Sequence, residues 1–163
     1  MALLVFTEGT LITQASALGL SREEIVRQVQ DGEVSVFDYA SYVPVGGAVN
    51  KLQAWKRQGV AIAYLTSRTT PREVEAIRQV LERYAFPKGE LFFRREGERY
   101  ADVAERILPD LLIEDDCESI GGEMEMTYPH IKPELKAKIK AIVVREFGGI
   151  DHLPDNISDL ASY

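Results

Sequence analysis

Four short apolar runs, separated by amphipathic segments, constrain the fold of this chain most strongly. The runs lie at residues 2–6, 60–65, 90–93 and 111–113. Continuous apolar runs of this length are typical of parallel strands that are buried on both faces. Helices that connect such strands pack on the two faces of the sheet. The sequence therefore predicts an α/β, three-layer sandwich with a central parallel, Rossmann-like sheet.

Signals for helix starts place helices between these strands. Ser21 with Glu24, and Thr70 with Glu73, fit the capping box, in which a hydroxyl and a carboxylate satisfy free backbone N–H groups. The apolar spacing predicts helices over about 21–30, 46–58, 70–84, 99–108 and 133–148. The polar tail, 148–163, is expected to be irregular apart from a short helical turn near Ile157.

The segment at about 13–45 interrupts this regular alternation. It contains one predicted helix and an aromatic stretch with Phe37, Tyr39 and Tyr42. We expect a small cap-like insertion after the first strand, packed over the end of that strand. The 163 residues suit a single domain over 1–163, and no Pro-rich or Gly/Ser-rich linker divides them.

Charge and composition exclude several classes of partner. The net charge of −7 disfavours a nucleic-acid partner, because phosphate backbones need clustered cations. No apolar run approaches the ~20 residues of a membrane-spanning helix, and the start of the chain lacks a signal-peptide pattern. A lone cysteine, Cys117, excludes an internal disulfide and suits a reducing compartment. The expected location is the cytoplasm.

Polar clusters follow three of the predicted strands, at residues 7–10, 66–70 and 114–116. The carboxyl ends of neighbouring parallel strands converge on one crevice, where ligands bind. Ordinary turns are the alternative, since Thr, Gly and Asp are common turn residues. Three clusters in register favour a binding site.

Two of these clusters indicate their own chemistry. Glu114, Asp115 and Asp116 repel one another, and their oxygens suit a hard cation such as Mg²⁺. A solvated loop or a helix cap is the alternative for them. The segment 66–68 offers two hydroxyls, a guanidinium and free N–H groups before a helix, which is a suitable anion cradle.

The order of the clusters resembles motifs one, two and four of the haloacid dehalogenase (HAD) superfamily of phosphohydrolases. The resemblance covers roughly residues 2–120 and rests on Glu-Gly-Thr-Leu at 8–11, Tyr-Leu-Thr-Ser-Arg at 64–68 and Leu-Ile-Glu-Asp-Asp at 112–116. The first motif of that family reads Asp-x-Asp-Gly-Thr, with a nucleophile and then an acid/base. Phe6 stands in the place of the nucleophile and Glu8 in the place of the acid/base. Phenylalanine cannot attack phosphorus, so the covalent route is closed and one expected Mg²⁺ ligand is lost.

The resemblance implies roles for the remaining residues. Motif three is assigned to Arg99, with Arg95 as the alternative. The implied catalytic residues are Glu8, Thr66, Arg99 and Asp115; the implied ligand-binding residues are Thr7, Gly9, Thr10, Ser67 and Arg68; and the implied metal ligands are Asp115, Asp116 and Glu8.

Two functions follow from different classes. The first is a catalytically inactive or highly divergent HAD-like module that binds a small anionic or phosphorylated ligand, or a protein partner. The second is a metal-assisted phosphohydrolase in which Glu8 acts as acid/base on an attacking water and Asp115 holds Mg²⁺. A receiver-like domain with an acidic pocket is a third alternative, which explains the order of the clusters less well. The sequence does not specify the substrate or the oligomeric state.

Overall fold

A five-stranded parallel sheet forms the centre of the protein. The computed structural model describes all 163 residues. The sheet has the order β5-β4-β1-β6-β7, and every neighbouring pair is parallel. Its strands are β1 (Ala2–Phe6), β4 (Ala61–Leu65), β5 (Leu91–Phe92), β6 (Leu111–Asp115) and β7 (Lys140–Val144). The predicted α/β class and parallel, Rossmann-like sheet are confirmed.

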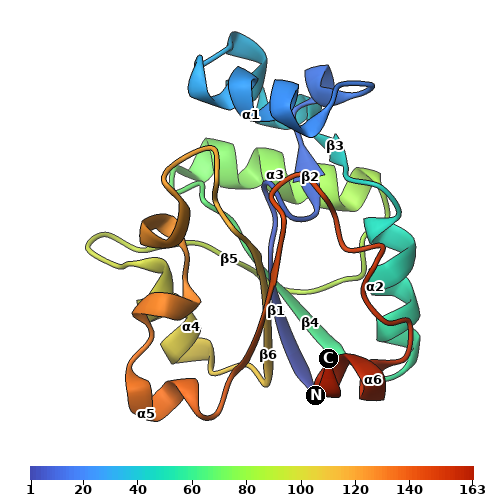
Figure 1. Ribbon diagram of the computed structural model, residues 1–163, viewed down its shortest axis with the longest axis vertical. Helices are drawn as coiled ribbons and strands as arrows, with labels where there is room; N and C mark the ends of the chain where they lie inside the picture. The colour runs from blue at the N-terminus through green and yellow to red at the C-terminus, as the bar shows by residue number, and fades with distance from the viewer.

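Helices cover both faces of the sheet, which completes the three layers (Figure 1). One face carries α2 (Ala48–Arg57), α3 (Pro71–Arg83) and α6 (Ile157–Ser162), and the other carries α4 (Tyr100–Ile107) and α5 (Pro133–Lys136). The side chains of β1 alternate between two apolar clusters, with Leu3 in the first and Leu4 in the second. None of the helices has the length and apolar character that crossing a bilayer requires.

The predicted N-terminal caps are present. At α1 (Arg22–Gln30), the Ser21 hydroxyl accepts from Glu24 N, and the Glu24 carboxylate accepts from Ser21 N at 2.7 Å. At α3 the Thr70 hydroxyl accepts from Glu73 N at 3.4 Å, whereas the Glu73 carboxylate accepts from that hydroxyl instead of from the Thr70 N–H. The capping box is therefore complete at α1 and half formed at α3.

The predicted helix over 133–148 is wrong. Its first turn is α5, but 140–144 form the edge strand β7, which pairs in parallel with β6. The cause is the run Ile142-Val143-Val144, whose β-branched side chains favour a strand. The apolar residues at 135, 139 and 142 follow a helical spacing, which led to the wrong prediction. Val143 lies half exposed on this edge.

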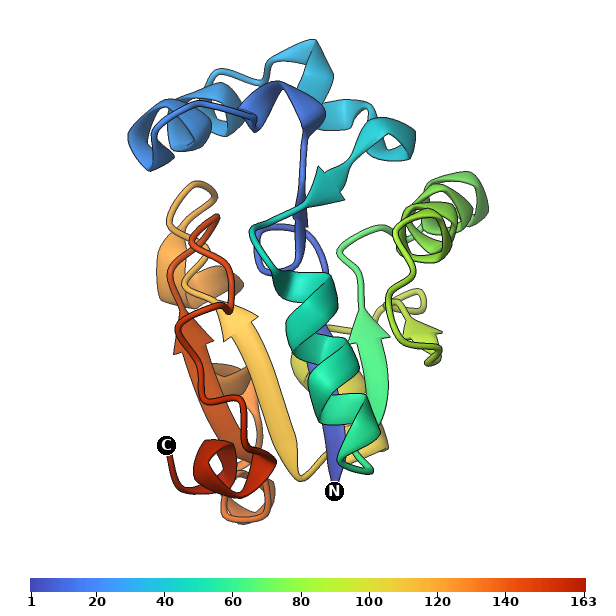
Figure 2. The same cartoon turned by 90° about the vertical axis from the view of Figure 1, so that its right-hand side faces the viewer.

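The segment after β1 lies over the carboxyl ends of the strands (Figure 2). It leaves the sheet through β2 (Ile12–Thr13) and returns through β3 (Val43–Pro44), which pair as an antiparallel ribbon. Between them lie α1 and three 3₁₀ helices, and two further 3₁₀ helices follow β6. The 3₁₀ helices are Ala15–Ala17, Val34–Phe37, Tyr39–Ser41, Gly122–Glu125 and Tyr128–His130.

Candidate functional site

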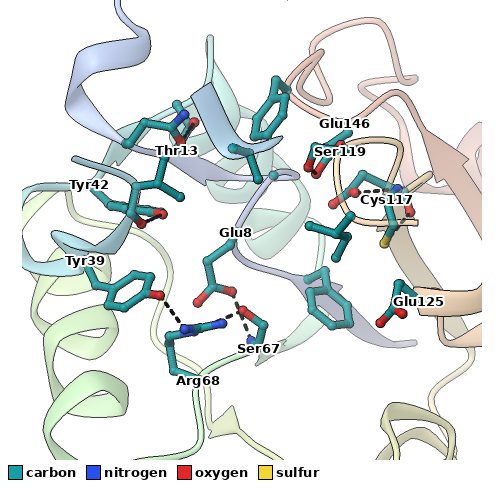
Figure 3. A pocket seen from close by; sticks show the side chains of 18 of the residues that line it. Glu8, Thr13, Tyr39, Tyr42, Ser67, Arg68, Cys117, Ser119, Glu125 and Glu146 are labelled. Carbon is teal, nitrogen blue, oxygen red and sulfur yellow. Dashed lines mark hydrogen bonds between the residues drawn. The ribbon is translucent and has the colours of Figure 1, made fainter. Parts of the chain in front are cut away.

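A cavity of about 430 Å³ lies between the carboxyl ends of the strands and the segment above them (Figure 3). This volume is within the usual range for a small-molecule site. The strand ends contribute polar side chains to its wall, and the overlying segment contributes mainly aromatic and aliphatic ones. We call it the Glu8 pocket, and its residues used below are Phe6, Glu8, Tyr39, Tyr42, Ser67, Arg68, Tyr100, Asp115 and Glu146.

The carboxylate of Glu8 is bound by the residues that follow β1 and β4. Its Oε1 accepts from the Thr66 hydroxyl at 2.5 Å, and its Oε2 accepts from Ser67 N at 3.1 Å. The Thr7 hydroxyl also lies 2.5 Å from Oε2 and 3.2 Å from the Leu65 carbonyl oxygen. Thr7 and Thr66 are fully buried. The segment predicted to be an anion cradle therefore contains an anion, and that anion is a side chain of the protein.

Arg68 connects this wall to the overlying segment. Its guanidinium donates to the Tyr39 hydroxyl and to Ser67 Oγ at 3.3 Å, and it lies 4.6 Å from the centre of the Tyr39 ring. No carboxylate lies within salt-bridge distance of it. Arg68 is therefore a cation of the pocket wall that is held by neutral partners and is available to an anionic ligand.

Phe6 ends β1 where the resemblance places a nucleophile. Its ring meets the ring of Tyr100 edge-on, with centroids 5.0 Å apart. Phe6 belongs to the apolar cluster under α4 and is 9% exposed. The pocket wall is thus hydrocarbon at this position, and no side-chain atom there can form a bond to phosphorus.

Asp115 is the buried carboxylate at the end of β6. Its Oδ2 accepts from the Thr10 hydroxyl at 2.7 Å and its Oδ1 from Cys117 N at 2.9 Å. Burial, reinforced by the neighbouring carboxylates of Glu114 and Asp116, raises the pKa of Asp115 to about 6 despite these two hydrogen bonds. A cation beside Asp115 would relieve this electrostatic cost.

Asp115, Asp116 and Glu146 form a carboxylate group in which one oxygen from each lies within 4.8 Å of the others. Glu146 accepts from Ser119 N at 2.7 Å and from Ser119 Oγ at 2.6 Å, and burial raises its pKa as well. Hard oxygen ligands at this spacing could hold a divalent metal ion. The sequence did not reveal Glu146, because it follows β7, the strand that was mistaken for a helix.

The tight approach of the chain to this carboxylate group requires glycine at position 9. Gly9 has a positive φ of 81°, and a Cβ there would lie 3.0 Å from Asp115 Oδ2 and 3.2 Å from Glu146 Cγ. Its carbonyl oxygen accepts from Phe147 N at 2.7 Å, which ties the β1 loop to the β7 loop. Gly9, which was predicted to bind ligand, therefore connects the β1 loop to the β7 loop at the site.

Apart from Arg99, the predicted site residues fall into three groups. Glu8, Ser67, Arg68, Gly9 and Asp115 line the pocket. Thr7, Thr10 and Thr66 are buried and hydrogen-bond carboxylates within the wall. Asp116 belongs to the carboxylate group, whereas Glu8, which was also predicted to bind metal, does not.

Neither arginine that was considered for motif three lies in the pocket. Arg99 forms an exposed ion pair with Asp102 at 3.0 Å, and Arg95 is exposed. A different residue, Arg94, lies 4.3 Å from the centre of the Tyr100 ring and has a buried Nε without a partner. Both Arg94 and Arg99 line a smaller cavity that also has Tyr100 in its wall.

Arg22, which was not predicted, ties the overlying segment to the carboxylate group. Its Nε donates to the Glu146 carbonyl oxygen at 2.9 Å, and its guanidinium pairs with Glu118 and lies 3.7 Å from Asp116 Oδ1. These carboxylates raise the pKa of Arg22, with the hydrogen bond to Glu118 as the largest cause. A cation of the protein therefore already offsets part of the negative charge.

Comparison with known proteins identifies the fold. No protein-family model matches the sequence, and no curated protein matches it. Two structures of the class C acid phosphatase from Bacillus anthracis resemble it at 16% identity. The match to the tungstate-bound structure has a TM-score of 0.57 and covers 91% of this chain and 68% of the phosphatase chain. The match to the other structure has a TM-score of 0.58 and covers 99% of this chain and 77% of the phosphatase chain.

A more distant likeness points to the same fold. A chain of the Pnkp1/Rnl/Hen1 RNA repair complex is 13% identical with a TM-score of 0.52, over 88% of this chain and 42% of its own. At these identities the likeness concerns the fold alone. The protein therefore has a HAD-like fold, which it shares with these structures.

Proposed function

We propose that this protein is a HAD-like ligand-binding module that has lost covalent phosphohydrolysis and binds a small phosphorylated or anionic ligand in the Glu8 pocket. The single observation that carries the proposal is Phe6: the strand end that would present the nucleophile presents a packed aromatic ring instead. A degenerate first motif is the expected result when a phosphohydrolase fold keeps its pocket and loses its chemistry.

The remaining wall supports binding of an anion. Thr66 Oγ1, Ser67 N and the Arg68 guanidinium are three donors at the end of β4, and no carboxylate pairs with Arg68. Donors that converge on one point of a partly apolar cavity fix the orientation of a small ligand. The segment at 13–45 acts as a cap, because Tyr39 and Tyr42 cover the pocket and Arg68 bonds Tyr39 across the boundary.

Mg²⁺ fits the carboxylate group. Asp115, Asp116 and Glu146 would hold it, and burial, together with the neighbouring carboxylates, raises the pKa of both Asp115 and Glu146. Bound there, Mg²⁺ would supply positive charge for a ligand oxygen.

The test is to measure binding and turnover on the same preparation. Tungstate and inorganic phosphate are titrated by calorimetry with and without Mg²⁺, and para-nitrophenyl phosphate hydrolysis is followed in parallel. We expect binding without turnover, and weaker anion binding in Arg68→Ala, with Arg72→Ala as the control on α3. The exposed Arg72 makes no contact with the pocket.

Two results would contradict the proposal in different ways. Ester hydrolysis that Glu8→Gln and Asp115→Ala both abolish would establish the alternative, a metal-assisted phosphohydrolase with Glu8 as acid/base. The absence of binding to the wild type and to every pocket variant would show that the pocket does not take anions.

A further inference from the structure

The anion cradle of the Glu8 pocket is filled by the protein itself. The Glu8 carboxylate accepts hydrogen bonds from Thr66 Oγ1 at 2.5 Å and from Ser67 N at 3.1 Å. A phosphoryl or tungstate oxygen that approached the same two donors would meet this carboxylate at hydrogen-bond distance. Two anions cannot share these donors, because each unit of negative charge repels the other.

The donors depend on Glu8 for their pairing. Thr66 Oγ1 accepts from Arg68 N at 3.1 Å, so its remaining capacity is its proton, which goes to Glu8. The Ser67 N–H has no other acceptor. Thr66 is fully buried while Glu8 occupies the cradle. Withdrawal of Glu8 would leave both donors directed into the cavity without an acceptor, which is costly unless a ligand supplies one.

Thr7 has a second acceptor available. Its hydroxyl lies 3.2 Å from the Leu65 carbonyl oxygen as well as 2.5 Å from Glu8. When Glu8 leaves, the Thr7 hydroxyl can still donate to the Leu65 carbonyl oxygen. Only the Thr66 hydroxyl and the Ser67 N–H then lose their acceptor. The cradle can change its occupant from Glu8 to a ligand without unpairing the end of β1.

We propose that Glu8 occupies the Thr66–Ser67 cradle as a competitor that belongs to the protein itself. An anionic ligand binds there only if its affinity for the cradle is high enough to displace the Glu8 carboxylate. This inference rests on the proposed function, because it assigns regulation of the same pocket. Glu8 must rotate off the cradle before a tetrahedral oxyanion reaches it. A free oxyanion therefore binds the wild type weakly, and removal of the Glu8 carboxylate strengthens its binding.

The experiment is a calorimetric titration of tungstate in Mg²⁺-free buffer, so that the carboxylate group contributes no metal-dependent binding. It compares the wild type with Glu8→Ala, Glu8→Gln, and Glu8→Ala combined with Thr66→Val. Glu125→Ala is the matched control, because it removes a carboxylate from the rim of the same pocket without touching the cradle. Thermal unfolding of each variant verifies that it is folded, and Glu8→Gln keeps the shape of the side chain if Glu8→Ala does not fold.

We expect Glu8→Ala to bind tungstate at least tenfold more tightly than Glu125→Ala does, with Glu8→Gln in between and the gain abolished by Thr66→Val. Equal gains in tungstate affinity in Glu8→Ala and Glu125→Ala would show that the effect comes from the net charge of the pocket and not from the cradle. That result would overturn the inference. Wild-type binding as tight as that of Glu8→Ala would also overturn it, while the proposed function would stand. Absence of binding in every protein would defeat the proposed function together with the inference.

Discussion

The ring of Phe6 meets the ring of Tyr100 edge-on at 5.0 Å, which joins the end of β1 to the first turn of α4. The contact makes position 6 part of the apolar core under α4. Phe6 therefore cannot act as a nucleophile, and its packing against Tyr100 contributes to the stability of the fold.

Replacement of Phe6 by aspartate is therefore expected to destabilise the protein strongly. The loss of a buried ring costs about 3–5 kcal/mol, and an unpaired carboxylate in its place adds to that cost. Phe6→Leu keeps most of the volume and should cost less than about 1.5 kcal/mol. Urea unfolding of the two variants measures the difference. Equal stability would show that position 6 still tolerates the polar group of a phosphohydrolase.

Glu114 anchors the loop after β6 through two backbone hydrogen bonds. Its carboxylate accepts from Thr127 N at 2.7 Å and from Tyr128 N at 2.8 Å, and burial raises its pKa in spite of them. Glu114→Ala should lower the free energy of unfolding by about 1–3 kcal/mol, because one buried and one partly buried N–H group lose their acceptor. Faster hydrogen exchange at Thr127 and Tyr128 should accompany the loss.

The exposed residue Glu123 in the same loop provides the control. Glu123→Ala should change the stability by no more than about 0.5 kcal/mol. A comparable loss in both variants would mean that Glu114 acts through the charge of the loop and not through its two hydrogen bonds.

Arg22 should oppose the binding of Mg²⁺ to the carboxylate group. Its guanidinium lies 3.7 Å from Asp116 Oδ1, so it repels a cation bound there. Arg22→Gln is expected to raise the Mg²⁺ affinity severalfold at low ionic strength, and added salt should shrink the effect. Calorimetric Mg²⁺ titration measures both quantities.

Arg27 lies on the same helix, is exposed and forms no ion pair, so Arg27→Gln is the matched control. Its Mg²⁺ affinity should equal that of the wild type. A lower Mg²⁺ affinity in Arg22→Gln would show instead that Arg22 holds the three carboxylates in position.

The sequence predicted the central sheet because buried parallel strands leave a local signal. The continuous apolar runs of β1 and β4 need no partner to be recognised. β7 carries a similar run at Ile142-Val143-Val144, but the helical spacing of Leu135, Ile139 and Ile142 masked it. The choice between them depends on pairing with β6, which is a tertiary contact.

The candidate site was predictable where it follows those strands and hidden where it does not. Glu8 and Asp115 were found because strand ends converge. Glu146 was missed together with β7, and Arg22 was missed because the contact of α1 with the β7 loop spans most of the chain. Arg99 was overvalued because the sequence shows a basic residue at a helix start but not that Asp102 pairs with it.

Asp115 should make the stability of the metal-free protein depend on pH. Its pKa in the folded state is about 6, above its ordinary value of 3.8, so the folded state binds more protons than the unfolded state between these values. The free energy of unfolding must therefore fall as the pH rises from about 4 to about 6, by up to about 3 kcal/mol from this group. The stabilising proton is absent above that range.

Asp115→Asn removes this titration and isolates its contribution. The amide oxygen can still accept from Thr10, while the lost bond from Cys117 N adds an offset that does not depend on pH. The free energy of urea unfolding is measured in EDTA at intervals from pH 4 to pH 7, a range that reaches within about one unit of both pKa values. The variant should gain stability relative to the wild type as the pH rises. Parallel stability curves for the two proteins would show that Asp115 is as well solvated, or as well paired, as in the unfolded chain.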